Sequence, residues 1–283
     1  MIGPKLCIIG HPVTYSRSPL LHGYWIKAHG LEGSYGREDV APDAADSFFA
    51  GFKSSLYAGG NVTAPHKEVA FRAVDEADDM ARVLGAVNTL WREEGRLMGS
   101  NTDVYGFMAN LDAGAPGWFD SARSAVVLGA GGAARAILHG LLERGVPHIH
   151  LANRTLDKAR RLADLFGARV TPMALDHVAG PLAETGLVVN TTTLGMKGHP
   201  PLDLDLSRVP ADAVVTDAVY VPLETPLLKA ARARDLRCVD GLGMLLHQGV
   251  PGFERWFGIR PRVDEALRAL IVADLAAKGQ LEA

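Results

Sequence analysis

Cysteine is scarce in this chain, and no residue pattern typical of a bound metal accompanies it. Of the 283 residues only two are cysteine, Cys7 and Cys238, and both lie in short apolar stretches. We expect two buried thiols, with neither a disulfide nor metal ligation. The 10 histidines show no His-Glu-x-x-His spacing and have no cysteine partners, so we expect no metal site.

The chain also lacks a strong charge of one sign and any long apolar run. Its formal net charge is -3, which gives no reason to expect nucleic acid or an anionic membrane as a partner. No segment reaches the length of a membrane-spanning helix, and the first residues contain no apolar run typical of a signal peptide. A cytoplasmic location is the default expectation.

The bulk composition is that of a globular protein. Hydrophobic residues make up 48% of the chain and charged residues 22%. A length of 283 residues allows one large domain or two of ordinary size. Residues 112–121 contain Gly114, Pro116 and Gly117, which is typical of a loop between domains.

The most informative stretch is Gly129-Ala130-Gly131-Gly132-Ala133-Ala134. The short stretch 124–128, apolar after Ser124, precedes it with strand character, and residues 135–144 follow it with apolar residues at helical spacing. A strand, a glycine turn and a helix N-terminus form a dinucleotide-binding unit, because the glycines let a pyrophosphate approach the backbone and the helix start faces the phosphates. An ordinary glycine turn between strand and helix is the competing interpretation.

Arg154 indicates which dinucleotide would bind. The next predicted strand, residues 148–152, ends in Asn153-Arg154-Thr155, and Lys158 follows one helical turn later. A site for NAD usually carries Asp or Glu here to hold the ribose 2′-hydroxyl, and this chain has neither. Arg154, Thr155 and Lys158 supply the charge and donors that a 2′-phosphate needs, which predicts NADP. The alternative is a solvated helix start that Thr155 caps.

The pattern of elements predicts an α/β protein. Short apolar strands alternate with helices over residues 124–240, which indicates a doubly wound parallel sheet. A second α/β region precedes it, with expected strands at 5–9, 35–40 and 61–63, helices at 20–28, 44–52, 65–73 and 75–84, and a hairpin at 86–99. An amphipathic helix over 263–278 would close the chain.

Two serines follow the first predicted strand. Ser16 and Ser18 lie in the polar stretch over residues 10–19. The simpler interpretation is that Ser18 caps the next helix and Ser16 is solvated. The functional interpretation places two hydroxyls at the carboxyl end of a strand, where ligands bind in α/β folds.

Lys67 and Asp103 would each lie in the first turn of a helix that follows a strand. Asn61 and Thr63 end the strand before Pro65, which would start the helix of Lys67. The helix dipole disfavours a lysine in this position and favours Asp103, whose simpler role is that of a capping acid. Because both helices follow strands, the two side chains would share one rim of an open sheet.

Taken in order, these segments resemble the shikimate dehydrogenase family. The similarity covers nearly the whole chain, and Tyr15 and Gly23 depart from it where many members have histidine and asparagine. It rests on Ser16-Arg17-Ser18-Pro19, Asn61 to Lys67, Gly85 to Thr89, Asn101-Thr102-Asp103, the glycine turn, Asn153-Arg154-Thr155, Tyr220, and Gly241 to Leu245 followed by Gln248.

The resemblance implies an oxidoreductase that acts on a CH–OH group. The reaction would be the reversible, NADPH-dependent reduction of 3-dehydroshikimate to shikimate, a step toward the aromatic amino acids. The resemblance also implies a substrate domain over residues 1–108, a Rossmann-type NADP domain over 109–242, and helices over 243–283 that return to the first domain. The small-molecule substrate would be the partner of a monomer or homodimer.

The resemblance further implies a role for individual residues. Lys67 and Asp103 would form the catalytic pair and touch the substrate, because a carbonyl that accepts hydride becomes an alkoxide that an ammonium can stabilise and protonate. The other substrate-binding residues would be Ser16, Ser18, Asn61, Thr63, Asn88, Tyr220 and Gln248. The cofactor-binding residues would be Gly129, Ala130, Gly131, Gly132, Ala133, Asn153, Arg154, Thr155, Lys158, Ala218 and Gly241.

Two alternatives share this fold. An NAD-preferring quinate/shikimate dehydrogenase is disfavoured by Arg154 and the missing acid, and weakly by Ser18 in place of threonine. A non-catalytic, NADP-binding sensor would not need both Lys67 and Asp103.

Overall fold

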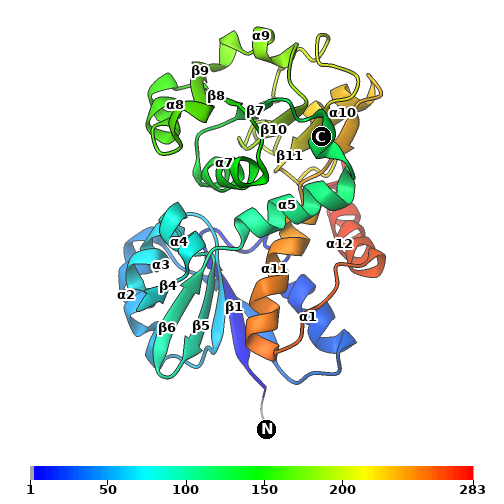
Figure 1. Ribbon diagram of the computed structural model, residues 1–283. Coiled ribbons are helices and arrows are strands. Elements are labelled where there is room, and N and C mark those ends of the chain that lie inside the picture. The colour runs from blue at the N-terminus through cyan, green and yellow to red at the C-terminus, as the bar shows by residue number, and fades with distance from the viewer. Residues whose placement is uncertain (1–2, 283) are drawn as a thin grey trace. The chain divides into compact units, whose positions relative to one another are not determined.

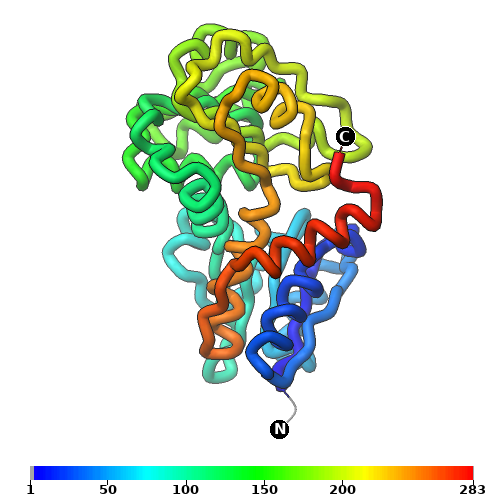
Figure 2. Tube along the Cα trace, turned by 90° about the vertical axis from the view of Figure 1, so that its right-hand side faces the viewer, coloured from blue at the N-terminus to red at the C-terminus, as the bar shows by residue number. Residues whose placement is uncertain are grey.

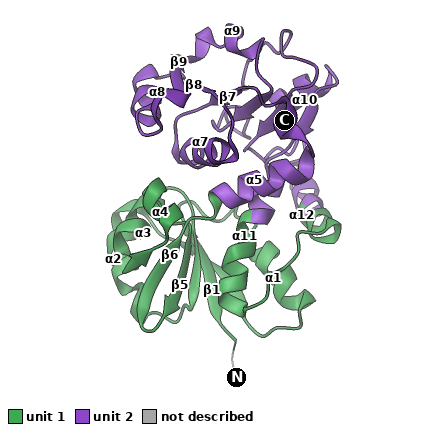
Figure 3. Cartoon of the chain, viewed as in Figure 1, with its two compact units in different colours: residues 1–103, 248–271 green, residues 104–247, 272–283 purple. Residues whose placement is uncertain are grey.

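The computed structural model describes residues 3–282 and divides into two compact units. Unit 1 comprises residues 1–103 and 248–271, and unit 2 comprises residues 104–247 and 272–283 (Figure 3). The C-terminal part of the chain, drawn in orange and red in Figure 2, is therefore shared between the units. Over the described range, no helix combines the length and the apolar character needed to cross a membrane.

Unit 1 contains a mixed six-stranded sheet in the order β2-β1-β3-β5-β6-β4. Its strands are β1 (Lys5–Gly10), β2 (Ser34–Asp39), β3 (Gly59–Val62), β4 (Glu76–Ala77), β5 (Thr89–Glu93) and β6 (Arg96–Ser100). Strand β1 runs parallel to β2 and β3, whereas β5 is antiparallel to both β3 and β6. As a result β3 and β6 end, and β5 begins, at the same edge of the sheet.

Helices cover both faces of this sheet (Figure 1). One face carries α2 (Ala45–Gly51), α3 (Lys67–Ala73) and α4 (Asp79–Leu84), with the short 3-10 turns η1 (Pro42–Ala44) and η2 (Phe52–Ser54); the other carries α1 (Ser18–Ala28) and the unit 1 part of α11 (Leu242–Phe257). Cys7 and Ile9 of β1 pack with Phe49 and Phe52 in one buried cluster. Because side chains alternate along a strand, the buried Leu6 and Ile8 face the opposite layer.

Unit 2 contains an all-parallel six-stranded sheet in the order β12-β11-β10-β7-β8-β9. This is the doubly wound order of dinucleotide-binding folds, with the switch point between β7 and β10. The strands are β7 (Ala125–Leu128), β8 (Ile149–Asn153), β9 (Val170–Ala174), β10 (Leu187–Asn190), β11 (Val214–Asp217) and β12 (Arg237–Val239). The helices are α5 (Asp103–Gly114), α6 (Trp118–Ser121), α7 (Gly132–Arg144), α8 (Leu156–Ala163), α9 (Ala179–Leu182) and α10 (Pro226–Arg232). Helix α12 (Glu265–Ala277) begins in unit 1 and ends in unit 2. Two short 3-10 turns, η3 (Gly167–Arg169) and η4 (Leu175–His177), also belong to unit 2.

The α/β class and the doubly wound sheet are confirmed, two local expectations are wrong, and one strand was missed. The helix expected over 75–84 starts only at Asp79, because Glu76 and Ala77 pair with β6 as strand β4. Strand β9 was not expected. The expected loop over 112–121 contains the end of α5 and the short helix α6, which the buried Trp118 anchors by donating its indole N–H to Asp112 Oδ1 at 2.8 Å.

Two glycines of unit 1 should respond in opposite ways to substitution by alanine. A Cβ at Gly60 of β3 would lie 2.3 Å from the carbonyl oxygen of Cys7, so Gly60→Ala must separate β3 from β1 and should lower the free energy of unfolding by about 3 kcal/mol. Gly23 is exposed on α1 with open space around it, and Gly23→Ala should raise the free energy of unfolding by roughly 0.5–1 kcal/mol. Urea unfolding of both variants checks this, and a Gly60→Ala protein as stable as wild type would contradict it.

Candidate active site

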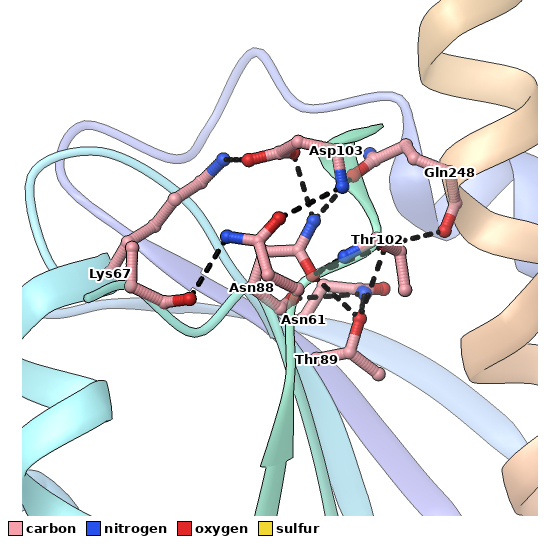
Figure 4. A network of polar contacts seen from close by, with 9 residues as sticks. Asn61, Lys67, Asn88, Thr89, Thr102, Asp103 and Gln248 are labelled. Carbon is pink, nitrogen blue, oxygen red and sulfur yellow. Dashed lines mark hydrogen bonds and ion pairs between the residues drawn. The ribbon is translucent and has the colours of Figure 1, made fainter. Parts of the chain in front are cut away.

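A lysine and a buried carboxylate form an ion pair in unit 1. Lys67 is the first residue of α3, after β3, and Asp103 is the first residue of α5, after β6. The Lys67 Nζ lies 2.5 Å from Asp103 Oδ2, and the two side chains are 30% and 8% exposed. The rim position predicted from the sequence therefore brings the two groups into direct contact (Figure 4).

Asp103 is held by side chains as well as by the lysine. Asn88 donates from Nδ2 to Asp103 Oδ1 at 2.9 Å, and the backbone N–H of Asp103 donates to Asn101 Oδ1 at 2.9 Å. Asn101 in turn donates to the carbonyl of Ala86 at 2.9 Å. Both oxygens of the buried carboxylate thus have partners, which a buried charge requires.

Asn88 is the centre of the polar network in Figure 4. Its side-chain oxygen accepts hydrogen bonds from the Thr102 backbone N–H at 2.9 Å and from the Thr89 hydroxyl at 2.9 Å. Its amide nitrogen donates to Asp103 and, at 3.1 Å, to Gln248 Oε1 of α11. Asn88 therefore links the carboxylate to Gln248, which lies 160 positions after Asn88 in the sequence.

Ser16 and Ser18 contact each other at the start of α1. The Ser18 backbone N–H donates to Ser16 Oγ at 3.2 Å, and the two hydroxyl oxygens are also 3.2 Å apart. Ser18 is the first helical residue, and the position before it, Arg17, makes no side-chain cap bond. The helix-capping role expected of Ser18 as the simpler interpretation is therefore wrong.

The structure joins several predicted site residues within unit 1. In unit 1 the joined residues are Asn61, Lys67, Asn88, Asp103 and Gln248, which one network connects. Thr63 directly follows β3 and is half-buried. Tyr220 belongs to unit 2. Thr89 and Thr102 belong to the motifs quoted for the family resemblance but were not predicted as site residues, although each stands beside a residue that was.

The glycine turn of unit 2 lies between β7 and α7, as predicted. Gly129 has φ +104°, and a Cβ there would lie 2.6 Å from Thr191 Oγ1. Gly131 and Gly132 have open space where a side chain would be, and the first turn of α7 carries no acidic residue. An uncrowded helix start without negative charge fits the phosphates of a dinucleotide.

Arg154 and Lys158 follow β8 and remain exposed. Within residues 3–282 neither side chain has an ion-pair or hydrogen-bond partner, while Asn153 donates to the Thr155 carbonyl at 2.8 Å. Thr155 makes no side-chain cap bond to α8, so the capping alternative for this residue is wrong. Two unpaired cations beside the strand end fit a 2′-phosphate, which needs positive charge and hydrogen-bond donors.

A second buried carboxylate, Asp217, organises the ends of β10 and β11. It accepts hydrogen bonds from Asn190 at 2.9 Å, from the Val219 backbone at 2.9 Å and from the Thr225 hydroxyl at 2.7 Å. Asn190 also accepts from the hydroxyl and the backbone N–H of Thr192. The network was not predicted from the sequence, and it fixes the segment that packs against Gly129.

Ala218 and Gly241 also lie together at these strand ends. A Cβ at Gly241 would lie 2.5 Å from the Ala218 carbonyl oxygen, so only a glycine allows this approach. The Ala218 backbone N–H donates to the Asn190 carbonyl at 2.9 Å. Both predicted cofactor residues therefore adjoin the Asp217 network. Among residues 3–282, no group of three or more His, Cys, Asp or Glu side chains could hold a metal ion.

Known proteins resemble this arrangement over the whole chain. The doubly wound sheet and open glycine turn of unit 2 define the class of dinucleotide-binding α/β proteins. Family models match residues 8–90 (shikimate dehydrogenase substrate binding domain), 118–195 (shikimate/quinate 5-dehydrogenase) and 241–271 (shikimate 5′-dehydrogenase C-terminal domain). The chain belongs to the shikimate dehydrogenase family.

Individual relatives support this assignment. The chain is 65% identical to the NADP(+) shikimate dehydrogenase of Azorhizobium caulinodans, over 99% of both chains. It is similar in structure to the Thermus thermophilus shikimate 5-dehydrogenase solved with NADP(H) and shikimate, with a TM-score of 0.86, 36% identity and coverage of 96% and 100%. It is also similar to the Corynebacterium glutamicum quinate dehydrogenase solved with NAD, with a TM-score of 0.88, 31% identity and coverage of 96% and 100%.

The charge of Asp217 should make stability depend on pH. Burial raises the pKa of this carboxyl to about 6 against the ordinary 3.8, so between these values the folded protein binds a proton that the unfolded chain has released. The contribution of Asp217 to the free energy of unfolding should therefore decrease as the pH rises from about 4 to 6, by at most about 3 kcal/mol, and stay level above that.

Asp217→Asn isolates this effect. Urea unfolding of wild type and variant at a series of pH values gives the difference between their free energies of unfolding. We expect the advantage of wild type over the variant to shrink as the pH rises through this window. A difference that stays constant from pH 4 to 7 would contradict the assignment.

Proposed function

We propose that this chain catalyses the reversible, NADPH-dependent reduction of 3-dehydroshikimate to shikimate. The observation that carries the proposal is the Lys67–Asp103 ion pair, embedded in a buried amide network in a chain 65% identical to an NADP(+) shikimate dehydrogenase. In this proposal unit 1 holds the substrate and unit 2 holds NADP. The chain's net charge of -3 offers no attraction for nucleic acid or anionic lipid. We place the protein in the cytoplasm, as a monomer or homodimer.

The ion pair supplies the proton of the proposed reaction. NADP(H), when bound, supplies or accepts the hydride at the carbonyl carbon. As the carbonyl oxygen gains negative charge, the Lys67 ammonium stabilises it and transfers a proton to it, which gives the hydroxyl of shikimate. Asp103 keeps the lysine pointed toward the substrate, because one N–H of Lys67 donates to its carboxylate and two others remain available.

The remaining polar groups suit a small polyhydroxylated acid. Gln248 accepts a hydrogen bond through Oε1, while its Nε2 has no partner among residues 3–282 and is available as a donor. The hydroxyls of Ser16, Ser18 and Thr63 add groups that both donate and accept. A site built from such groups selects substrates by their hydroxyl pattern, because an analogue without a hydroxyl leaves a polar group unpaired.

NADP is the proposed cofactor because of the groups around the glycine turn. The backbone over residues 129–133 would hold the pyrophosphate at the start of α7. Asn153, Arg154, Thr155 and Lys158 would hold the 2′-phosphate and ribose. Ala218, Gly241 and the turn that Asp217 fixes would complete the cofactor site from the ends of β11 and β12.

Replacing the lysine should abolish turnover while leaving binding nearly intact. The wild-type chain should oxidise shikimate with NADP, followed by the absorbance of the reduced nicotinamide. Lys67→Met keeps most of the side-chain volume but has no proton to transfer, and should lower kcat by about 10²–10⁴-fold. The Kd for shikimate, measured by calorimetry, should rise by less than about tenfold.

Lys53→Met is the matched control. Lys53 also forms a 2.5 Å ion pair with a carboxylate of unit 1, Asp75, but it lies outside the network around Asp103. This variant should keep the kcat of wild type. Near-normal turnover by Lys67→Met would overturn the assignment of the proton donor.

Removing Arg154 should weaken NADP selectively. Arg154→Ala loses a charge-assisted contact to the 2′-phosphate, and the Kd for NADP should rise by about 10–100-fold while that for NAD stays unchanged. Arg160→Ala removes the same charge from α8, where Arg160 pairs with Asp157, and should change neither value. Equal losses for both cofactors in Arg154→Ala, or faster turnover of quinate with NAD by wild type, would favour the quinate dehydrogenase alternative.

A further inference from the structure

A buried histidine and a partly buried tyrosine of unit 1 take no part in the proposed mechanism. His22 of α1 is 1% exposed, and its ring stacks on Tyr35 of β2 with centroids 4.2 Å apart and an interplanar angle of 17°. Trp25, Phe253 and Trp256 surround His22 with ring centroids at 5.3–6.2 Å. Burying a polar imidazole in an aromatic cluster has a desolvation cost that an apolar side chain would avoid, so its presence there calls for an explanation.

Both residues make hydrogen bonds to the side chain of Asn61. The Tyr35 hydroxyl donates to Asn61 Oδ1 at 2.6 Å, and His22 Nε2 lies 3.2 Å from the same oxygen. The Asn61 amide nitrogen donates to the Asn88 carbonyl at 3.2 Å and to Thr89 Oγ1 at 3.1 Å. A carboxamide has two acceptor and two donor positions, so the protein itself uses all four positions of Asn61.

The hydrogen bonds beyond Asn61 run in one direction. Asn61 donates to Thr89, the single hydroxyl proton of Thr89 goes to Asn88 Oδ1, and Asn88 donates to Asp103 and Gln248. If the Asn61 amide were reversed, its oxygen would face Thr89 and take the proton that now goes to Asn88. The orientation of Asn61 is thus coupled to that of Asn88. The Thr102 backbone N–H, which donates to Asn88 Oδ1, favours the same orientation of Asn88.

His22 fixes the orientation of Asn61 because it is neutral. Burial lowers the pKa of His22 to about 3, so at neutral pH the ring carries one N–H only. Its Nδ1 has no hydrogen-bond partner among residues 3–282. A buried acceptor without a partner is unfavourable, and the hydrogen bond from Nε2–H to Asn61 is the one polar contact that the ring makes in the described chain.

We propose that His22 and Tyr35 are positioning residues that set the orientation of the Asn61 carboxamide and, through Thr89, that of Asn88 against Asp103 and Gln248. In this account Asn61 acts on the substrate only through Asn88, and its own carboxamide does not bind the substrate. The inference rests on the proposed function.

Removing the two donors should weaken substrate binding and leave cofactor binding unchanged. Tyr35→Phe deletes a single hydroxyl, and His22→Leu deletes the imidazole donor while keeping an apolar side chain. Each should raise the KM for shikimate by about tenfold, the loss expected for one hydrogen bond to a buried amide, with kcat less affected. The Kd for NADP, a property of unit 2, should stay at the wild-type value.

Three further variants separate positioning from folding. In His22→Gln a side-chain N–H can again reach Asn61, and the KM should return to within about threefold of wild type even where the thermal midpoint does not. Tyr57→Phe removes another phenol of unit 1, whose hydroxyl donates to Glu38, and should leave the KM unchanged. Asn61→Asp, which cannot donate to Thr89 when ionised, should raise the KM as Tyr35→Phe does. A wild-type KM in Tyr35→Phe and His22→Leu, or no recovery in His22→Gln, would overturn the proposal.

A measurement without turnover keeps the inference distinct from the proposed function. Nitrogen NMR of histidine-labelled protein, with His22→Gln as the assignment reference, should show His22 as the neutral Nε2–H tautomer from pH 5 to 8. A protonated ring or the Nδ1–H tautomer would overturn the positioning role. Failure of wild type to oxidise shikimate would instead contradict the proposed function, while the tautomer would still support or refute the orientation of Asn61.

Discussion

A carboxylate removed from water must be hydrogen-bonded on both oxygens, and unit 1 meets this requirement for Asp103. Its two partners come from two strand ends, Lys67 after β3 and Asn88 before β5, and Asp103 itself follows a third strand end, that of β6. These ends meet at one edge only because β3, β5 and β6 are neighbours in the sheet. The ion pair therefore exists only when the central part of the sheet is correctly ordered.

Much of this arrangement could be predicted from local sequence. The glycine turn, the strand–helix alternation and the missing acid near Arg154 are all local signals. The structure has the turn between β7 and α7, and Arg154 directly after β8, as the sequence predicted. Lys67 and Asp103 could be placed on one rim because a residue just after a strand lies at that strand's end. Their direct contact needed the order β3-β5-β6, which no local pattern specifies.

The features that sequence reasoning missed depend on contacts between distant segments. Strand β4 is two residues long, and its pairing with Met98 and Gly99 of β6 overrides the helical pattern around it. Tyr35 gave only a strand signal, and His22 looked like an ordinary helix residue. Their link to Asn61 appears only when β1 places β2 and β3 on its two sides.

The two buried carboxylates, Asp217 and Asp103, differ in role because they have different partners. Asp217 has three neutral donors and no cationic partner within the described part of the chain, and burial raises its pKa to about 6. Asp217 holds together the three segments that contain Asn190, Val219 and Thr225. All three partners are neutral donors, so none is a cation that a ligand could bind. Asp103 instead forms an ion pair with Lys67, whose side chain is 30% exposed and whose other two N–H groups have no partner among residues 3–282. The amide network on one side of Asp103 and the partly exposed Lys67 side chain on the other would set the position of the proposed proton donor before the substrate binds. Such preorganisation is the condition for electrostatic stabilisation of a developing alkoxide.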